Sequence, residues 1–206
     1  MKRSRISAAI LAGGKSRRFG EDKALLKIEG RSVLPDLVAR LGELFDPVRV
    51  IVDQAGKVEL GSAQVFQDRV IGLGPLGGLL TALENSPTPL CFVAACDMPF
   101  LDLKVISFLT AQLQTEDILV PSIGGREEPL TAFYSVRCIG PIQACLEKGG
   151  RSIRAIWPEV DTRVVELQGH FPLEQLRRCF LNLNVYPQDL QVALKMIKSN
   201  YSEDNG

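Results

Sequence analysis

Short, continuously apolar runs alternate along this chain with longer segments in which apolar residues recur at helical spacing. This alternation predicts a single α/β domain with a mostly parallel sheet, because strands that are apolar throughout must be covered on both faces by helices. The expected strands are residues 6–11, 48–52, 63–66, 91–95, 118–120, 131–135, 164–167 and 180–183. The expected helices are residues 33–45, 76–85, 103–113, 139–147 and 188–197.

Residues 9–26 contain the segment with the clearest chemical meaning. The first apolar run ends at Leu11 and is followed by Gly13 and Gly14, which let the backbone turn sharply and approach a ligand closely. The cationic residues of this segment are Lys15, Arg17, Arg18 and Lys23. Ammonium and guanidinium groups beside a glycine-rich backbone are donors for phosphate oxygens, so we expect a nucleotide site in which Arg17 contacts phosphate. The role of Lys15 stays open.

Two glycine-loop patterns match the chain incompletely. Residues 14–16 agree with the end of the phosphate loop G-x-x-x-x-G-K-S/T, but Ala9 stands where the first glycine is required. Residues 72–77 fit G-x-G-x-x-G, yet the apolar run before them ends at Phe66, and Pro75 favours a turn into a helix. The chain therefore matches neither pattern well.

Aspartates follow three further expected strands, at Asp53, Asp68 and Asp97. In a parallel sheet, ligands bind outside the carboxyl ends of the strands, so we expect these side chains to converge near the glycine segment. Taken singly, Asp53 and Asp68 could equally be turn or cap residues. Asp97 directly follows a buried run and precedes Met98-Pro99. A carboxylate in that place suits magnesium, which takes one or two carboxylates together with waters and substrate phosphates.

The composition excludes several classes of protein. A chain of 206 residues with 46% hydrophobic content can bury a substantial core and is not disordered. The 24 basic and 24 acidic residues cancel, which argues against a nucleic-acid-binding or membrane-binding surface. No apolar stretch approaches the roughly 20 residues of a membrane helix, and the first residues lack the pattern of a cleaved leader, so we expect a cytoplasmic protein.

The sequence also gives little support for a disulfide framework, a zinc site or a histidine-based catalytic triad. The 5 cysteines are an odd number without a C-x-x-C pair, which indicates neither a disulfide framework nor a zinc site, and we expect reduced core residues. The 1 histidine, His170, lies in a loop-like context and is expected at the surface rather than in a catalytic triad.

The segment Leu11–Leu25 matches the signature L-A-G-G-x-S-x-R-x-G-x-D-K-x-L and therefore resembles the sugar- and cofactor-nucleotidyltransferases. Within that superfamily the chain is most similar to the molybdenum cofactor guanylyltransferases. The further segments that carry this resemblance are residues 74–78, 95–100, 129–134, 181–185 and 188–190. The resemblance implies a Rossmann-like, three-layer nucleotidyltransferase domain over residues 1–200, followed by a polar tail at residues 201–206.

The resemblance also implies roles for individual residues. The nucleotide-binding residues that it implies are Leu11, Ala12, Gly13, Gly14, Lys23, Asp53, Asp68 and Asp97. Among them the backbone of residues 11–13 reads the base, Lys23 binds phosphate and Asp68 contacts the nucleoside. Arg17, Lys23 and Asp97 would act at the reacting phosphates, with Asp97 as the metal ligand. Asp53 stands where the family carries asparagine, and a carboxylate cannot donate the hydrogen bond of an amide.

The second substrate is expected beside the remaining motifs. Residues 74–78 open a helix whose N-terminal amides can hold a phosphate, and the family places its pterin phosphate near the matching loop, which includes Gly78. A tight loop-to-helix connection is the alternative explanation for this segment. Asn182 and Asn184 could line the acceptor site or cap the helix that follows. Residues 127–129 are expected to form a mobile rim over the site.

The implied reaction transfers GMP from GTP to the phosphate of molybdopterin, with magnesium bound and pyrophosphate released. Positioning and charge stabilisation account for most of such catalysis, and a phosphate nucleophile needs no strong general base. The implied partners are GTP, molybdopterin with or without molybdenum, and molybdenum cofactor biosynthesis proteins or molybdoenzyme chaperones. The alternatives are a cytidylyltransferase, a sugar- or polyol-phosphate nucleotidyltransferase, and a non-catalytic nucleotide-binding protein, against which Lys23 and Asp97 argue.

Overall fold

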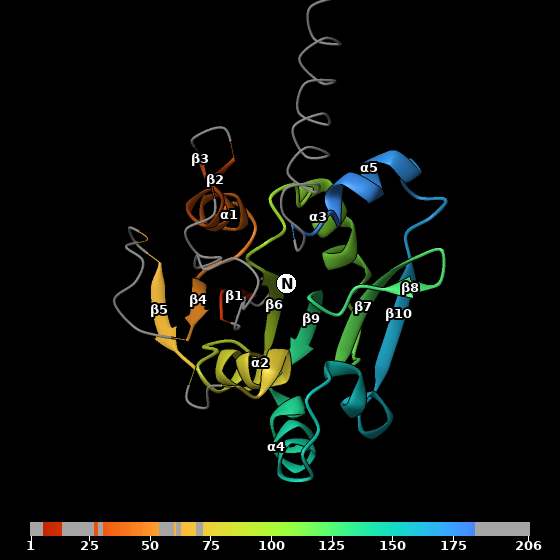
Figure 1. Cartoon of the computed structure of the whole chain (residues 1–206). Helices are drawn as coiled ribbons and strands as arrows, with labels where there is room; N and C mark the ends of the chain where they lie inside the picture. Colours follow the sequence, from red (N-terminus) through yellow and green to blue (C-terminus); the bar gives the residue numbers. More distant parts are fainter. Residues whose placement is uncertain are drawn as a thin grey trace, which may run out of the picture.

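The structure is a computed structural model that describes residues 6–13, 27–28, 31–53, 60, 63–68 and 72–183. Its main sheet has the strand order β10-β7-β9-β6-β1-β4-β5, with β8 paired to β7 (Figure 1). The strands of this sheet are β1 (Ser7–Leu11), β4 (Val48–Val52), β5 (Gln64–Gln67), β6 (Leu90–Ala95), β7 (Ile118–Ile123), β8 (Arg126–Glu127), β9 (Thr131–Ser135) and β10 (Thr162–Glu166). A separate antiparallel pair is formed by β2 (Lys27–Ile28) and β3 (Arg31–Ser32).

Helices cover both faces of the main sheet (Figure 1). The α-helices are α1 (Val33–Leu41), α2 (Gly74–Glu84), α3 (Leu103–Gln112), α4 (Ile139–Glu147) and α5 (Leu173–Cys179). Two 3₁₀ segments, η2 (Val136–Cys138) and η3 (Ile153–Glu159), complete the described elements. The expected three-layer α/β architecture is therefore confirmed.

Strand direction determines where a site can form. β1 pairs in parallel with β4 and β6, β4 with β5, and β7 with β10. β9 is antiparallel to both β6 and β7, so β7 and β10 run in the same direction as β6. The carboxyl ends of β1, β4, β5, β6, β7 and β10 consequently lie at one edge of the sheet, which we call the carboxyl edge.

The core forms one layer on each face because successive strand residues point to opposite sides. Phe92 and Phe133 pack toward α1, α3 and α5, with ring centroids 5.0 Å apart. Their neighbours Val93 and Ala132 lie on the other side with α2, α4 and η3. These side chains are fully buried, and each large apolar side chain removed from water contributes about 1.5–3 kcal/mol.

One expected strand is wrong. Phe180 caps the C-terminus of α5, and residues 181–183 form no strand. Phe180 and Leu183 are nevertheless buried, next to Leu176 and Cys179, which α5 contributes to the core. A short apolar run cannot be assigned to strand or helix from periodicity alone, which explains the error. The expected helix at residues 188–197 lies outside the described residues.

The expectations for cysteine and histidine agree with the structure. None of the five cysteines, all of which lie in the described residues, forms a disulfide bond; four of them are buried and Cys145 is partly so. His170 is exposed and its ring packs on Phe108 with centroids 4.8 Å apart. Among the described helices, none has the length and apolar character needed to cross a membrane.

Candidate active site

Four adjacent strands deliver the predicted nucleotide residues to the carboxyl edge. In the sheet order β6-β1-β4-β5, these strands are followed respectively by Asp97, residues 12–13, Asp53 and Asp68. Backbone hydrogen bonds continue past the strand ends: Ala12 N donates to Ile51 O at 2.8 Å, Cys96 N to Leu11 O at 3.1 Å and Asp68 N to Val52 O at 2.7 Å. The structure therefore brings together the strand ends that the sequence predicted to converge.

Asp53 lies directly against the glycine segment. A Cβ atom at Gly13 would stand 2.1 Å from Asp53 Oδ1, closer than any real contact permits. Position 13 must therefore be glycine unless the aspartate moves. The close approach places a half-buried carboxylate beside the backbone that is expected to read the base. A carboxylate only accepts hydrogen bonds, so any group of a ligand bound here by Asp53 must be a donor.

Asp68 is oriented by α2. Thr81, which is buried in that helix, donates its hydroxyl to Asp68 Oδ1 at 2.8 Å. On the same helix a Cβ at Gly78 would lie 3.6 Å from both δ carbons of Leu11. Gly78 is thus buried beneath the segment expected to read the base. The small residues of α2 allow the helix to pack closely under this part of the site.

The first turn of α2 is exposed at the carboxyl edge. Gly74 and Pro75 are exposed, and Leu73 at the N-cap provides no side-chain hydrogen bond to the helix. Gly74 has φ of 69°, a conformation that favours glycine. N-terminal amides of a helix without a side-chain cap can donate to a phosphate. The geometry suits the phosphate role that the sequence suggested for residues 74–78.

Asp97 lies where three segments meet. β6 is buried along most of its length, and the Asp97 side chain in the following turn is 4% exposed. Leu183 N donates to Asp97 O at 2.9 Å, and Ala95 N donates to Leu130 O at 3.0 Å. The strand end that carries Asp97 is therefore held between the segment before β9 and the segment after α5.

Asn182 is brought to the same place by the Leu183 contact. Its side chain is partly buried, and its Oδ1 atom is buried with no hydrogen-bond partner among the described residues. A buried carbonyl oxygen of this kind is costly to leave unpaired, which favours a donor from a ligand or water. Several predicted residues, namely Gly14, Lys15, Arg17, Lys23 and Asn184, lie outside the described residues, so their expected roles remain predictions.

The expected rim at residues 127–129 is anchored at each residue. Arg154 Nη2 donates to Glu127 O at 2.9 Å and to its Oε2 at 3.0 Å. Glu128 N donates to Pro121 O at 2.9 Å, and Tyr134 OH donates to Pro129 O at 2.5 Å. Burial raises the pKa of Glu128, an effect that the nearby arginines at 126 and 154 oppose.

Sequence reasoning missed Glu166, which ends β10 at the carboxyl edge. Its carboxylate accepts hydrogen bonds from Ser122 Oγ and from the backbone amides of Gly124, Gly125 and Gln168. These hydrogen bonds lower the pKa of Glu166 to about 2, and the bond from Gln168 N has the largest effect. A glutamate at the end of a polar edge strand carries no motif, so no pattern in the sequence would have identified it.

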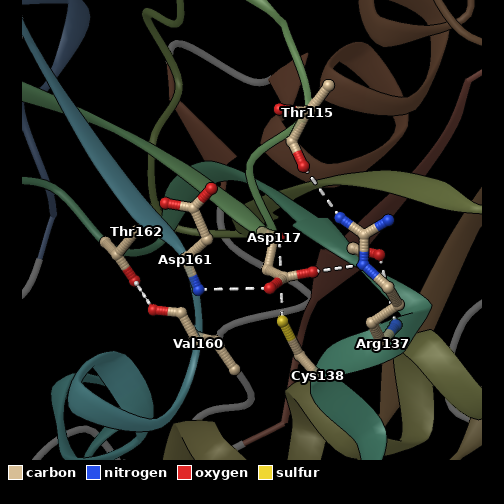
Figure 2. Close-up of polar contacts among 8 residues, drawn as sticks. Thr115, Asp117, Arg137, Cys138, Val160, Asp161 and Thr162 are labelled. Atoms are coloured by element: carbon tan, nitrogen blue, oxygen red, sulfur yellow. Dashed lines mark hydrogen bonds and ion pairs between the residues drawn. The ribbon is translucent and has the colours of Figure 1, made fainter.

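Figure 2 shows a second polar cluster, which includes residues directly before the parallel strands β7 and β10 and therefore lies at the edge of the sheet opposite to the carboxyl edge. Asp117 directly precedes β7, and its two carboxylate oxygens accept from Arg137 Nε and from the backbone amide of Asp161, the latter at 3.1 Å. Arg137 Nη2 also donates to Thr115 O at 2.9 Å. The cluster ties the end of β9 to the beginnings of β7 and β10, so its role is structural.

Comparison with known proteins identifies relatives over almost the whole chain. The profile of the MobA-like NTP transferase domain matches residues 8–163. A probable molybdenum cofactor guanylyltransferase of Pelotomaculum thermopropionicum is 33% identical over 196 residues, which cover 94% of each chain. A protein of the same name from Halalkalibacterium halodurans is 34% identical over 191 residues, covering 88% of this chain and 93% of the relative.

A solved structure supports the fold. Molybdopterin-guanine dinucleotide biosynthesis protein A from Archaeoglobus fulgidus superposes with a TM-score of 0.80 over 94% of this chain and 100% of that protein. Its sequence identity to this chain is 22%, so the likeness concerns the fold alone. The overall fold of this chain is therefore similar to that of a solved protein structure.

Proposed function

Because this chain belongs to the MobA-like NTP transferase family and is a nucleotidyltransferase, we propose that it transfers GMP from GTP to the terminal phosphate of molybdopterin. An oxygen of the acceptor phosphate bonds to the α-phosphorus of GTP, the bond from that phosphorus to the bridging oxygen breaks, and pyrophosphate leaves. The product is molybdopterin guanine dinucleotide. One observation supports the proposal most strongly. Asp97, Gly13, Asp53 and Asp68 lie in a row along one edge of the sheet, in a chain whose relatives are named probable molybdenum cofactor guanylyltransferases.

The nucleotide would bind across β1, β4 and β5. Backbone amides and carbonyls of residues 11–13 have fixed positions and can match the edge of a base. The Asp53 carboxylate beside Gly13 accepts hydrogen bonds, and guanine presents neighbouring N–H donors on its pairing edge. Asp68, held by Thr81, would accept from the hydroxyls of the nucleoside. The acceptor character of Asp53 therefore supports guanine as the base.

The phosphates would lie between the cationic loop and Asp97. Arg17 and Lys23 would donate charge-assisted hydrogen bonds to phosphate oxygens. Among the described residues, no group of three His, Cys, Asp or Glu side chains could hold a metal by itself. The single buried carboxylate of Asp97, at the carboxyl edge, fits a magnesium ion that substrate phosphates also bind, because this ion takes few protein ligands. Bound magnesium would neutralise charge on the reacting phosphates.

The acceptor would bind beside the end of β6, next to the nucleotide. The exposed first turn of α2 offers backbone amides for its phosphate, and Asn182 Oδ1 offers an acceptor for N–H groups of a pterin. Asn184 would contribute in the same region. A phosphate nucleophile is already anionic, so positioning it in line with the leaving group is the main task of these residues. The product would pass to molybdoenzyme chaperones or other proteins of cofactor assembly.

The test is a comparison of substrates. Pyrophosphate release is measured in magnesium with GTP, ATP or CTP, each with and without molybdopterin, and with the pterin both free of and loaded with molybdenum. We expect release only when GTP and molybdopterin are both present. Turnover with CTP, or with a sugar or polyol phosphate as acceptor, would assign the chain to another nucleotidyltransferase activity. Tight nucleotide binding without turnover on any acceptor would indicate a regulatory protein.

A further inference from the structure

The carboxylate of Glu166 connects β10 to the turn between β7 and β8. Ser122 Oγ donates to Oε2 at 2.9 Å and Gly125 N donates to it at 3.1 Å. Gly124 N donates to Oε1 at 3.0 Å, and Gln168 N donates to the same oxygen at 2.9 Å. Both oxygens are therefore engaged, and the Ser122, Gly124 and Gly125 donors all belong to the β7–β8 hairpin. We call this arrangement the Glu166 clasp.

The hairpin turn has a conformation that suits the clasp. Ile123 and Arg126 pair across the turn, and the two residues between them, Gly124 and Gly125, have φ values of 57° and 81°. Two consecutive positive φ values are typical of a type I′ turn. The amides of both glycines then reach the same carboxylate, as in the backbone nests that bind anions. In this protein the anion is a side chain of the neighbouring edge strand.

The hairpin continues directly into the segment that packs beside Asp97. Glu127 in β8 is bound by Arg154, and Glu128 N donates to Pro121 O. Leu130 O then accepts from Ala95 N, and Thr131 Oγ1 donates to Met98 Sδ at 3.0 Å. Ala95 lies two residues before Asp97, and Met98 directly follows it. A continuous chain of contacts therefore runs from the clasp to the end of β6.

The clasp lies on the half of the carboxyl edge that the proposed nucleotide site does not occupy. β1, β4 and β5 are on one side of β6, whereas β9, β7 and β10 are on the other, with β8 beside β7 (Figure 1). Resting on the proposed function, we propose that Glu166 is a positioning residue for the phosphate-bearing acceptor. It fixes the β7–β8 hairpin, and through it residues 128–131, so that the acceptor meets the nucleotide beside Asp97.

The kinetic test is Glu166→Gln in the full chain. Glutamine keeps the length of the side chain but replaces one oxygen by an amide nitrogen that cannot accept, so the donors on one side of the clasp lose their acceptor. We expect the KM for molybdopterin to rise about tenfold, the scale of one lost hydrogen bond, while the KM for GTP stays within about twofold. Glu159→Gln, at the exposed end of η3, is the matched control and should leave both constants unchanged.

A second variant changes the backbone conformation of the same turn. Gly124→Ala forces an L-residue into positive φ and places a Cβ 3.2 Å from Gln168 Oε1. It should raise the KM for the acceptor in the same selective way. The double variant with Glu166→Gln should show less than the sum of the two effects, because both disrupt one contact set. Additive effects, or an equal rise in the KM for GTP, would overturn the positioning role.

Hydrogen exchange separates the clasp from the proposed function. The amides of Gly124 and Gly125 are followed without any substrate, and Glu166→Gln should make them exchange faster than in the wild type and in Glu159→Gln. Unchanged exchange would mean that the clasp does not hold the hairpin. Faster exchange with an unchanged acceptor KM would mean that the hairpin does not position the acceptor. Lack of turnover by the wild type with GTP and molybdopterin would instead count against the proposed function, and the exchange result would still stand.

Discussion

The two halves of the carboxyl edge are constructed differently. In the half formed by β6, β1, β4 and β5, Asp97, Asp53 and Asp68 each follow a strand, so the pairing of parallel strands places them. In the half formed by β9, β7 and β10, Glu127 and Glu166 bind donors that belong to other segments of the chain. The first half therefore presents acids at positions fixed by the sheet, whereas the second uses its acids to fix the shape of the backbone.

This difference predicts two kinds of variant. Changes to acids in the first half should reduce nucleotide binding or the chemical step while the fold persists. Changes in the second half should act through the position of the hairpin and should appear mainly in the use of the acceptor. Any variant of the first half that alters only the acceptor constant would break the comparison.

The largest effect is expected at Asp97. Asp97→Ala and Asp97→Asn should each reduce pyrophosphate release by at least about a hundredfold, since neither side chain supplies a charged ligand at the reacting phosphates. The measurement is turnover in saturating GTP, molybdopterin and magnesium, with thermal unfolding as the control for the fold. Near-normal turnover of either variant, with cooperative unfolding, would remove Asp97 from the metal role.

The next effect is expected at Lys23, which the sequence places in the cationic loop. Lys23→Ala should weaken triphosphate binding and slow turnover by about tenfold or more, because a hydrogen bond to a charged group contributes about 1.5–3 kcal/mol. Lys104→Ala, which removes an exposed lysine from α3, is the matched control for a general loss of positive charge. Unchanged GTP titrations for Lys23→Ala would make it a solvated surface residue.

Base choice gives a smaller and more specific effect. The wild type should bind GTP more tightly than CTP or ATP, and Asp53→Ala should reduce the ratio of GTP to CTP affinity by about tenfold, the scale of one well-placed pair of hydrogen bonds to a base. Glu43→Ala, in the exposed turn after α1, controls for the lost charge. Tighter binding of CTP by the wild type would move the chain to the cytidylyltransferases.

The two halves also differ in how far the sequence could predict them. β1, β4 and β6 were predictable because each is a short, mostly apolar run that is followed within two residues by a glycine or an aspartate, and the same pattern indicated the positions of Gly13 and Asp97. The clasp was not predictable, because Ser122 and Glu166 are 44 residues apart and meet only after β10 has paired with β7. The direction of β9 was likewise hidden, since an antiparallel strand between parallel neighbours has no distinct apolar pattern.

The smallest effect is the pH dependence of the clasp. The pKa of Glu166 is lowered from its usual 4.5 to about 2, first by the hydrogen bond from Gln168 N and then by those from Gly124 N, Gly125 N and the Ser122 hydroxyl. A depressed pKa in the folded protein means that the stabilisation is fully present above about 4.5 and is lost as the pH falls toward 2. The donors are amides and a hydroxyl, which do not titrate in this range.

The unfolding temperature of the wild type should therefore exceed that of Glu166→Gln by a constant amount above pH 4.5, and the difference should shrink between that pH and about 2. Because Glu166 is an exposed side chain, solvent screening keeps this difference small, and the exchange rates of Gly124 and Gly125 are the more sensitive measurement. Those rates should converge between the two proteins as the pH falls through the same range, after correction for the intrinsic pH dependence of exchange. A difference that persists unchanged to the lowest pH would show that the ionised carboxylate does not hold the hairpin, and the second half of the edge would then owe its shape to the Arg154 contacts with Glu127.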